Sequence, residues 1–224
     1  MKNVKRRAEP ASLVKNAQKW ENDLINALTL FKKGGQEVKE SLFNRYNKPD
    51  VKDALIKMYK GMCCYCETEI GVVSYEHIEH RKPKSLFPAM TFNWDNLHLS
   101  CPKCNIEKLN KWNSNKPILD AVLDVPIDRH LTYKSTGTGL RRWAKSERGK
   151  VTINHCKLNR SKLKISRTYV FTETIGSVMA INAIFDSGTD IFEANNLISE
   201  LKDKTKGSFG TVIKFAMDNL LKVP

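Results

Sequence analysis

Two pairs of cysteines have the spacing of a metal site. Cys63 and Cys66 form one C-x-x-C pair, and Cys101 and Cys104 form a second. Each pair can chelate from one tight turn, and two pairs supply the four thiolates of a tetrahedral Zn²⁺ site. We therefore predict one structural zinc ion held by these four residues. Cys64 is expected to be a small buried side chain, with a role as an alternative ligand left open.

A long insert separates the two pairs. A simple zinc ribbon spaces its pairs by about 15–20 residues, whereas 34 residues lie between Cys66 and Cys101. We therefore expect the zinc to clamp the two ends of a larger insert. Glu79, His80 and Asn96 lie inside it, and Asn105 directly follows the fourth cysteine.

These polar residues have the chemistry that phosphodiester hydrolysis requires. His80 lies between a carboxylate and a basic run, and is the best candidate for a general base. Glu79 and Asn105 are hard oxygen donors suited to Mg²⁺ or Mn²⁺, which would contact the scissile phosphate and the leaving oxygen. Asn96 is expected to fix the loop that holds His80. Lys108, one helical turn after Asn105, is expected to reach a phosphate.

Simpler interpretations of the same residues stay open. His80 would then be an ordinary surface histidine, and Asn105 a helix cap after the second cysteine pair. His77 and His98 are expected to be structural. Glu76 is expected to be a solvated strand residue rather than a second carboxylate at the metal.

The charge of the chain indicates a polyanionic partner. The net charge is +14, and nucleic acid is the leading candidate for such a basic protein. Residues 61–112 are neutral overall, whereas residues 1–60 carry +7 and residues 113–160 carry +6. Solvated basic surfaces are the alternative. The residues expected to contact nucleic acid are Arg81, Lys82, Lys84, Arg141, Arg142 and Lys145.

The elements that must position these residues are mostly helical. Apolar residues recur every three or four positions over 11–33, which predicts an amphipathic helix, and Pro49 is typical of the start of a second. Later stripes predict helices at 171–185, 191–201 and 209–220, whereas short strands are expected near 130–134 and 150–154. The predicted division of the chain is an N-terminal helical region (1–60), a zinc-clamped core (61–112) and a C-terminal basic strand region with helices (113–224).

The core motif resembles that of HNH endonucleases in their zinc-clamped form. The resemblance rests on Cys63-x-x-Cys66, Glu79-His80, Asn96-Leu97 and Cys101-x-x-Cys104-Asn105-x-x-Lys108. It implies an α+β protein with a ββα-metal finger, in which Glu79 takes the place of an Asp or His and Asn105 that of the final His. The implied activity is metal-dependent hydrolysis of nucleic acid, with DNA favoured. A non-catalytic zinc-containing nucleic-acid-binding module and an RNA-cleaving HNH nuclease are the alternatives.

A wider stretch of the chain resembles a narrower group, the PtuB nucleases of Septu-type and retron-linked anti-phage systems. The matching segments are residues 5–10, 64–67, 79–85 and 158–160. This resemblance implies an antiviral role and a PtuA-type ATPase as partner.

The C-terminal region is expected to serve as scaffold and docking site. Residues 161–224 carry a net charge of only +1, and the last helix has an apolar band, including Phe215 and Met217, that is wider than one core-facing stripe needs. No run approaches the ~20 apolar residues of a membrane span, and the basic N-terminus lacks an apolar continuation. We therefore expect a cytoplasmic protein without a membrane partner.

Overall fold

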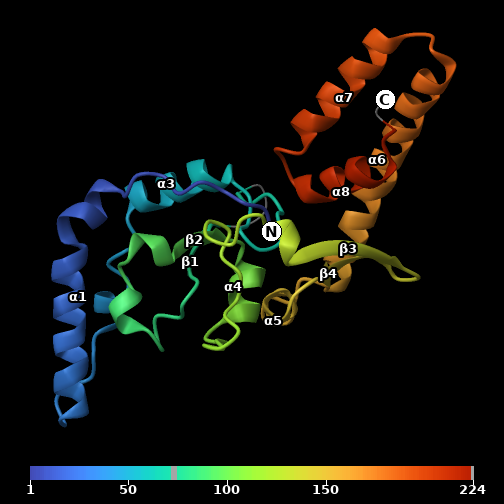
Figure 1. The fold of residues 1–224 in the computed structure, drawn as a ribbon. Helices are drawn as coiled ribbons and strands as arrows, with labels where there is room; N and C mark the ends of the chain where they lie inside the picture. Colours follow the sequence, from blue (N-terminus) through green and yellow to red (C-terminus); the bar gives the residue numbers. More distant parts are fainter. Residues whose placement is uncertain (72–74, 223–224) are drawn as a thin grey trace.

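The computed structural model describes residues 1–71 and 75–222 and confirms the predicted α+β class (Figure 1). The N-terminal region is helical, with α1 (Ala11–Lys32), α2 (Glu40–Phe43) and α3 (Pro49–Tyr59). Asp50, in the first turn of α3, accepts hydrogen bonds from the amide and hydroxyl of Ser12, which joins α3 to the start of α1. These helices lie beside the hairpin that follows them.

A small hairpin and a short helix form the centre of the molecule. Strands β1 (His77–His80) and β2 (Leu97–Ser100) are antiparallel, with His77 opposite Ser100 and His80 opposite Leu97. The short 3-10 turns at Pro88–Met90 and Trp94–Asn96 lie in the connection between them, and helix α4 (Pro102–Lys108) follows β2 directly. This ββα arrangement is the one implied by the sequence motif.

A second hairpin follows after a 3-10 turn at Ile127–Arg129. Its strands are β3 (Leu131–Thr136) and β4 (Gly139–Ala144), so the strand expected near 130–134 is present. The strand expected at 150–154 is wrong, because these residues belong to helix α5 (Glu147–His155). Ser146 explains the error: its hydroxyl accepts a hydrogen bond from the amide of Gly149 and begins a helix despite the β-branched residues that follow.

The C-terminal helices form an arm. Helix α6 (Ser161–Ser187) extends from the second hairpin, and α7 (Ile191–Lys204) and α8 (Gly210–Leu220) pack on one side of it (Figure 1). The three predicted helical stripes lie in these helices. Asp190 caps α7 by accepting a hydrogen bond from the amide of Glu193. In the part of the chain that the structure describes, no helix is both long enough and apolar enough to cross a membrane.

Two apolar clusters hold the described chain together. The larger contains residues from all three predicted regions, among them Leu55, Leu97 and Leu131. The smaller belongs to the arm, where Val178 and Ile181 of α6 pack against residues of α7 and α8. The predicted domain boundaries remain a sequence-based division, drawn across a shared core.

The apolar band of α8 is covered by the chain itself. Phe215 packs against Tyr133 and Phe171, with ring centroids 5.5 and 5.9 Å apart. Met217 packs against the arm cluster. The width of the band therefore reflects contacts with two cores at once, so the band alone does not indicate a docking surface, and the predicted docking role stays a prediction.

Glu67 joins the arm to the first cysteine turn. Its carboxylate is buried and accepts hydrogen bonds from the amide and hydroxyl of Thr211, and it pairs with the amino group of Met1. Arg142 lies 3.7 Å from the same carboxylate. Burial opposes ionisation, but these positive charges and donors outweigh it and lower the pKa of Glu67 to about 2.

We predict that Glu67→Gln lowers the free energy of unfolding by about 3–5 kcal/mol at neutral pH, because it leaves buried positive groups without a counter-charge. A carboxylate whose folded pKa is depressed stabilises the fold above its unfolded pKa, here 4.5. The difference from the wild type should therefore shrink as the pH falls from about 4.5 towards 2. Urea unfolding at several pH values measures it; the exposed Glu69→Gln should show no such difference.

Candidate active site

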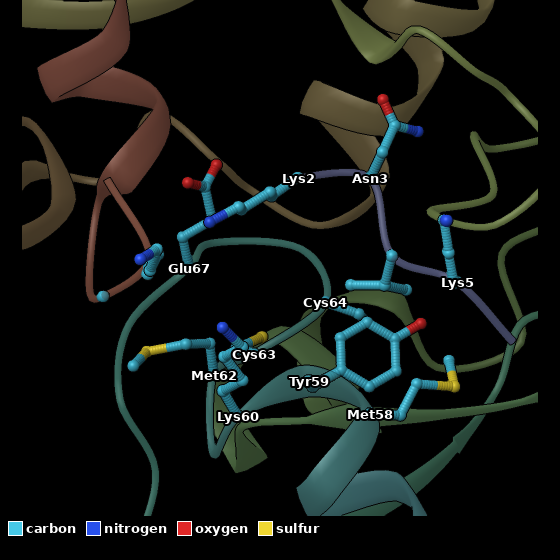
Figure 2. A pocket seen from close by; sticks show the side chains of 13 residues that line it. Lys2, Asn3, Lys5, Met58, Tyr59, Lys60, Met62, Cys63, Cys64 and Glu67 are labelled. Atoms are coloured by element: carbon cyan, nitrogen blue, oxygen red, sulfur yellow. The ribbon is translucent and has the colours of Figure 1, made fainter. Parts of the chain in front are cut away.

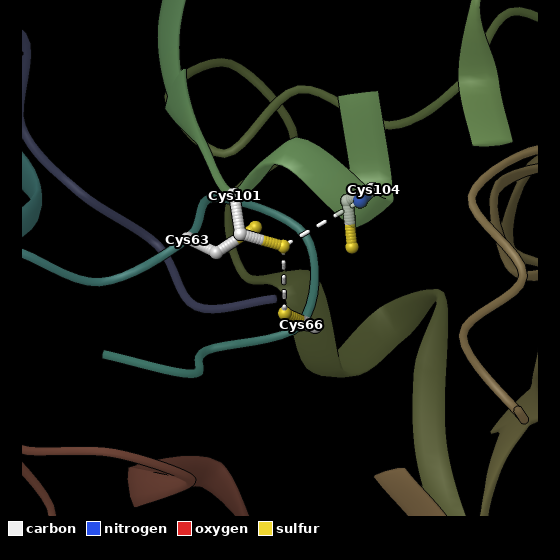
Figure 3. A group of neighbouring side chains, drawn as sticks. All are labelled: Cys63, Cys66, Cys101 and Cys104. Atoms are coloured by element: carbon white, nitrogen blue, oxygen red, sulfur yellow. Dashed lines mark hydrogen bonds between the residues drawn. The ribbon is translucent and has the colours of Figure 1, made fainter. Parts of the chain in front are cut away.

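The four predicted zinc ligands come together in the structure (Figure 3). The sulfur atoms of Cys63, Cys66, Cys101 and Cys104 all lie within 4.8 Å of one another, and those of Cys66 and Cys101 are 3.8 Å apart. Tetrahedral Zn–S bonds of about 2.3 Å place sulfurs about 3.8 Å apart, so the cluster fits zinc. The amide of Cys104 also points at Cys101 Sγ, which caps α4.

Other cysteines lie outside this cluster. Cys64 and Cys156 are buried, and burial raises the pKa of both thiols well above the ordinary value. Cys64 does not belong to the group of four sulfurs, which agrees with the expectation that it is a small core residue. Arg160 instead approaches the cluster, with its Nη1 3.5 Å from Cys104 Sγ.

The predicted catalytic residues meet at a cleft of about 480 Å³ between β1 and α4. Glu79 and His80 reach it from β1, and Asn105 and Lys108 reach it from α4. Asn105 lies inside α4, whose cap is Cys101, so the helix-cap interpretation of Asn105 is wrong. The cleft is also lined by Tyr46, Ile78, Pro83, Lys84, Ser85, Leu109 and Asn110.

His80 is held as a neutral imidazole with one nitrogen left for chemistry. Its Nε2 lies 2.9 Å from the carbonyl oxygen of Thr91, which can only accept, so Nε2 carries the proton and Nδ1 keeps its lone pair. Burial lowers the pKa of His80 to about 4. The ring of Tyr46 packs edge-on against the imidazole at 4.5 Å between centroids. His80 is therefore a buried imidazole with a fixed tautomer and not an ordinary surface histidine.

Glu79 and Lys108 form a buried ion pair. Lys108 Nζ lies 2.5 Å from Glu79 Oε1 and donates to the carbonyl oxygen of His80 at 2.7 Å. The Tyr65 hydroxyl donates to the same Oε1 at 3.1 Å. Burial raises the pKa of Glu79, and Lys108 partly offsets this. Lys108 is 1% exposed and engaged with β1, so the prediction that it reaches a phosphate is wrong.

The oxygen donors of the cleft fit a hard divalent cation. Asn105 Nδ2 lies 2.9 Å from His77 Nδ1. If the amide donates this bond, its Oδ1 is the atom left to act as a ligand. Among the described residues, both polar contacts of the Glu79 carboxylate go to Oε1, which leaves Oε2 as a second ligand. A carboxylate and an amide oxygen beside a cleft suit Mg²⁺ or Mn²⁺.

Asn96 holds the segment that follows His80. Its Nδ2 donates to the carbonyl oxygens of Lys82 and Met90 at 3.0 Å each, and its Oδ1 accepts from the amide of Lys82 at 2.8 Å. The side chain is 3% exposed. It fixes backbone on both sides of the cleft loop, in keeping with the positioning role expected of it.

A family model described as HNH endonuclease matches residues 63–111. The matched segment begins at the first cysteine of the cluster and ends beyond Lys108, so it contains the cysteine cluster and the residues of β1 and α4 that line the cleft. Residues 63–111 are an HNH endonuclease domain.

Two curated relatives match more of the chain. Septu protein PtuB of Bacillus thuringiensis is 32% identical over 135 residues, which is 59% of this chain and 51% of the relative. Septu protein PtuB of Bacillus mycoides (strain KBAB4) is 30% identical over 158 residues, covering 57% of this chain and 53% of the relative. The chain thus spans about half the length of the curated relatives it matches.

The basic residues after His80 differ in what they can contact. Lys84 lines the cleft of the HNH domain, with its Nζ 2.7 Å from Asn44 Oδ1. Lys82 is half-buried. Arg81 turns away from the cleft: its guanidinium pairs with Asp120 at 3.0 Å and donates to the carbonyl oxygen of Ile118. The structure therefore gives Arg81 an internal role in place of the predicted phosphate contact.

The second predicted basic group is also divided. Arg141 and Lys145 are exposed on and beside β4. Arg142 is 3% exposed, and its guanidinium donates to the carbonyl oxygen of Met1 and to Thr211 Oγ1. Alternation along the strand sends neighbouring side chains to opposite faces. Arg142 is therefore a core residue, and the prediction that it contacts nucleic acid is wrong.

Sequence reasoning missed three residues that shape the HNH site. Tyr65 lies between Cys64 and Cys66, in one of the segments that match the PtuB group, but that resemblance assigns it no role. Thr91 acts through its carbonyl oxygen, which any residue type supplies. Tyr46 comes from a loop outside the motif, so its contact with His80 depends on tertiary packing that spacing does not reveal.

A second cavity, of about 260 Å³, lies beside the first cysteine turn (Figure 2). Tyr59, Cys64 and Glu67 line it together with residues of the amino-terminal segment. The residues predicted to be catalytic or to bind the cation, Glu79, His80 and Asn105, line the other cleft, which is therefore the candidate active site. His98, whose Nδ1 lies 2.6 Å from the Tyr59 hydroxyl, is buried and structural, as expected.

We predict that Cys104→Ala abolishes zinc binding and unfolds the HNH domain. A structural zinc site contributes on the order of 10 kcal/mol of folding free energy in small modules. Metal analysis of the purified protein should give about one zinc per chain for the wild type and none for the variant, with loss of cooperative unfolding. Cys64→Ala is the matched control, because it removes a neighbouring buried thiol outside the cluster. A Cys104→Ala protein that keeps its zinc would contradict the ligand assignment, and one that folds without zinc would contradict the structural role of the site.

Proposed function

We propose that this protein is a metal-dependent HNH endonuclease that hydrolyses phosphodiester bonds of nucleic acid. The observation that carries the proposal is the state of His80: it is neutral, its Nε2 donates to a fixed carbonyl, and Nδ1 remains to accept a proton at the edge of the cleft. A binding module that only holds nucleic acid has no need of such a group.

In this mechanism His80 takes the proton from the attacking water at Nδ1. The carbonyl of Thr91 keeps the opposite nitrogen protonated and stabilises the imidazolium that forms. The ring of Tyr46 packs edge-on against the imidazole, and Lys108 Nζ donates a hydrogen bond to the backbone carbonyl of His80. The base therefore keeps its direction towards the cleft during proton transfer.

Glu79 and Asn105 would hold the catalytic cation. A bound Mg²⁺ or Mn²⁺ would supply positive charge for the phosphate oxygen and for the leaving 3′ oxygen. Lys108 keeps Glu79 ionised and oriented in a buried setting, and His77 fixes the amide of Asn105. Lys84, at the rim of the cleft, would contact a neighbouring phosphate.

We further propose that the substrate is DNA and that the protein serves in anti-phage defence with a PtuA-type ATPase. The net charge of +14 supports a nucleic-acid substrate. The preference for DNA and the ATPase partner rest on the resemblance to HNH nucleases of the PtuB group. The two curated relatives named Septu protein PtuB support the assignment to a defence system.

We expect His80→Ala to lower DNA cleavage by about 10²–10⁴-fold, because no other group in the mechanism accepts the water proton. His80→Gln, which retains a donor for Thr91 but no base, should lose as much. Mg²⁺-dependent nicking of plasmid DNA measures both, with an RNA transcript assayed in parallel to test the substrate.

His130→Ala is the control, since His130 bonds to Ser146 beside the second hairpin and away from the cleft. Each variant should retain its zinc and its circular dichroism spectrum. More than a tenth of wild-type activity in either His80 variant would remove His80 from its role. Absence of cleavage by the wild type on both substrates would favour the binding-module alternative.

We expect the double variant Arg141→Ala/Lys145→Ala to reduce the salt dependence of DNA binding by up to about 2 units of slope, because each phosphate contact releases counterions. Binding is measured over a range of salt concentrations in the His80→Ala background, so that the DNA stays intact. Lys202→Ala/Lys204→Ala removes two exposed lysines from α7 and should leave the slope unchanged. Equal slopes for wild type and the β4 variant would exclude this patch.

A further inference from the structure

Helix α6 has a second apolar face opposite the one that packs against its own chain. Arg167, Thr174 and Ile181 lie on its buried face: Arg167 contacts the ring of Tyr133, and Ile181 packs in the arm cluster with residues of α7 and α8. On the other side, Ile165 and Tyr169 are each 67% exposed and Met179 is 66% exposed. A helix that needed only one core would carry polar side chains there.

The exposed face follows a heptad pattern. Its residues are separated alternately by four and three positions, and all are exposed: Ile165, Tyr169, Thr172, Gly176, Met179 and Ala183. We call these six residues the α6 seam. This spacing is the a/d pattern of a coiled coil, in which a second helix lies along the first. With 27 residues, α6 is about 40 Å long, which gives the seam several layers of contact.

We propose that the α6 seam binds a second copy of this chain, with the two α6 helices antiparallel. A two-fold axis at the level of Thr174 pairs large side chains with small ones. Ile165 then meets Ala183 of the second copy, and Thr172 meets Gly176. Tyr169 of one copy meets Met179 of the other in the layer between these two. Each layer joins an a position to a d position, as an antiparallel pair requires.

Charges at the ends of the seam favour the same alignment. Lys162 lies one seam step before Ile165, and Asp186 lies one step after Ala183; both are exposed. The antiparallel register places Lys162 beside Asp186 of the second copy, and symmetry repeats this pair at the other end. Asp186 already pairs with Lys222 at 3.0 Å, so Lys162 would join an existing exposed ion pair.

A parallel alignment does not fit the seam. It would place Lys162 against Lys162 and Asp186 against Asp186, and would stack two tyrosines in one layer and two glycines in another. Like charges and unequal layers both oppose such a pair. The antiparallel register carries one unfavourable feature: Glu173, which flanks the seam, would lie near Glu173 of the second copy.

Sedimentation equilibrium of the full chain tests the proposal. The mass should rise with protein concentration from 25.6 kDa towards twice that value. Tyr169→Lys/Met179→Lys places two lysines opposite each other in each of the two layers that Tyr169 and Met179 form, and should keep the protein monomeric. Phe192→Lys is the matched control, because Phe192 is an exposed apolar residue of α7 outside the seam, and its association should equal that of the wild type.

Two further variants test the register. Lys162→Asp should weaken association a few-fold, and adding Asp186→Lys and Lys222→Asp should restore it, because the triple change exchanges every charge of the group formed by Lys162, Asp186 and Lys222. Glu173→Gln should strengthen association. All these positions are exposed, so circular dichroism should be unchanged.

A wild-type protein that stays monomeric at every concentration would overturn the proposal, as would a Tyr169→Lys/Met179→Lys protein that still dimerises. Failure of the charge exchange to restore association would overturn the antiparallel register. Plasmid cleavage by the monomeric variant separates this outcome from the nuclease proposal, which does not depend on the seam.

Discussion

The four-sulfur cluster is the constraint on which the active site depends. Cys101 follows β2 directly and caps α4, so a metal held there fixes the angle at which the helix leaves the hairpin. That angle brings Lys108 to Glu79 and Asn105 to His77. A hairpin with four-residue strands and a seven-residue helix buries too little apolar surface to hold these contacts alone. A metal held by the four sulfurs would add to the stability that this hairpin and helix gain from the shared core.

Polar contacts connect this small centre to the rest of the chain. Glu67, next to Cys66 of the cluster, binds Thr211 of α8 and lies beside Arg142 of β4. Arg160, at the start of α6, donates to Cys104 Sγ. Burial of these charges is costly unless each is paired and hydrogen-bonded. Their pairing therefore ties the arm and the second hairpin to one arrangement around the cysteine cluster.

Local chemistry explains what the sequence could predict. Cysteine spacing indicated the cluster, and the residues around His80 indicated the cleft, because metal ligation and proton transfer demand particular residue types at short separations. Tertiary contacts explain the failures. Three basic residues were predicted to contact phosphate because the sequence alone does not distinguish an exposed basic residue from a buried one. Their acidic partners decide which of them face inwards: Asp120 pairs with Arg81, Glu67 with Arg142 and Glu79 with Lys108. The helix α5 was missed because one capping serine outweighed a β-branched run.

Helix α6 packs in two apolar clusters, and this determines how a partner bound to the arm could affect the HNH domain. Its first half packs with the cluster that surrounds the HNH domain, and its second half packs with α7 and α8. It also begins at Arg160, beside Cys104 of the cluster. These contacts alone do not transmit a change from the arm to the HNH domain, because a ligand shifts an equilibrium only by its unequal affinity for two states. A partner that binds every packing of α6 equally well would therefore position the nuclease without altering it. A partner that binds a second packing of α6 more tightly would act on α4 and the cleft through Cys104.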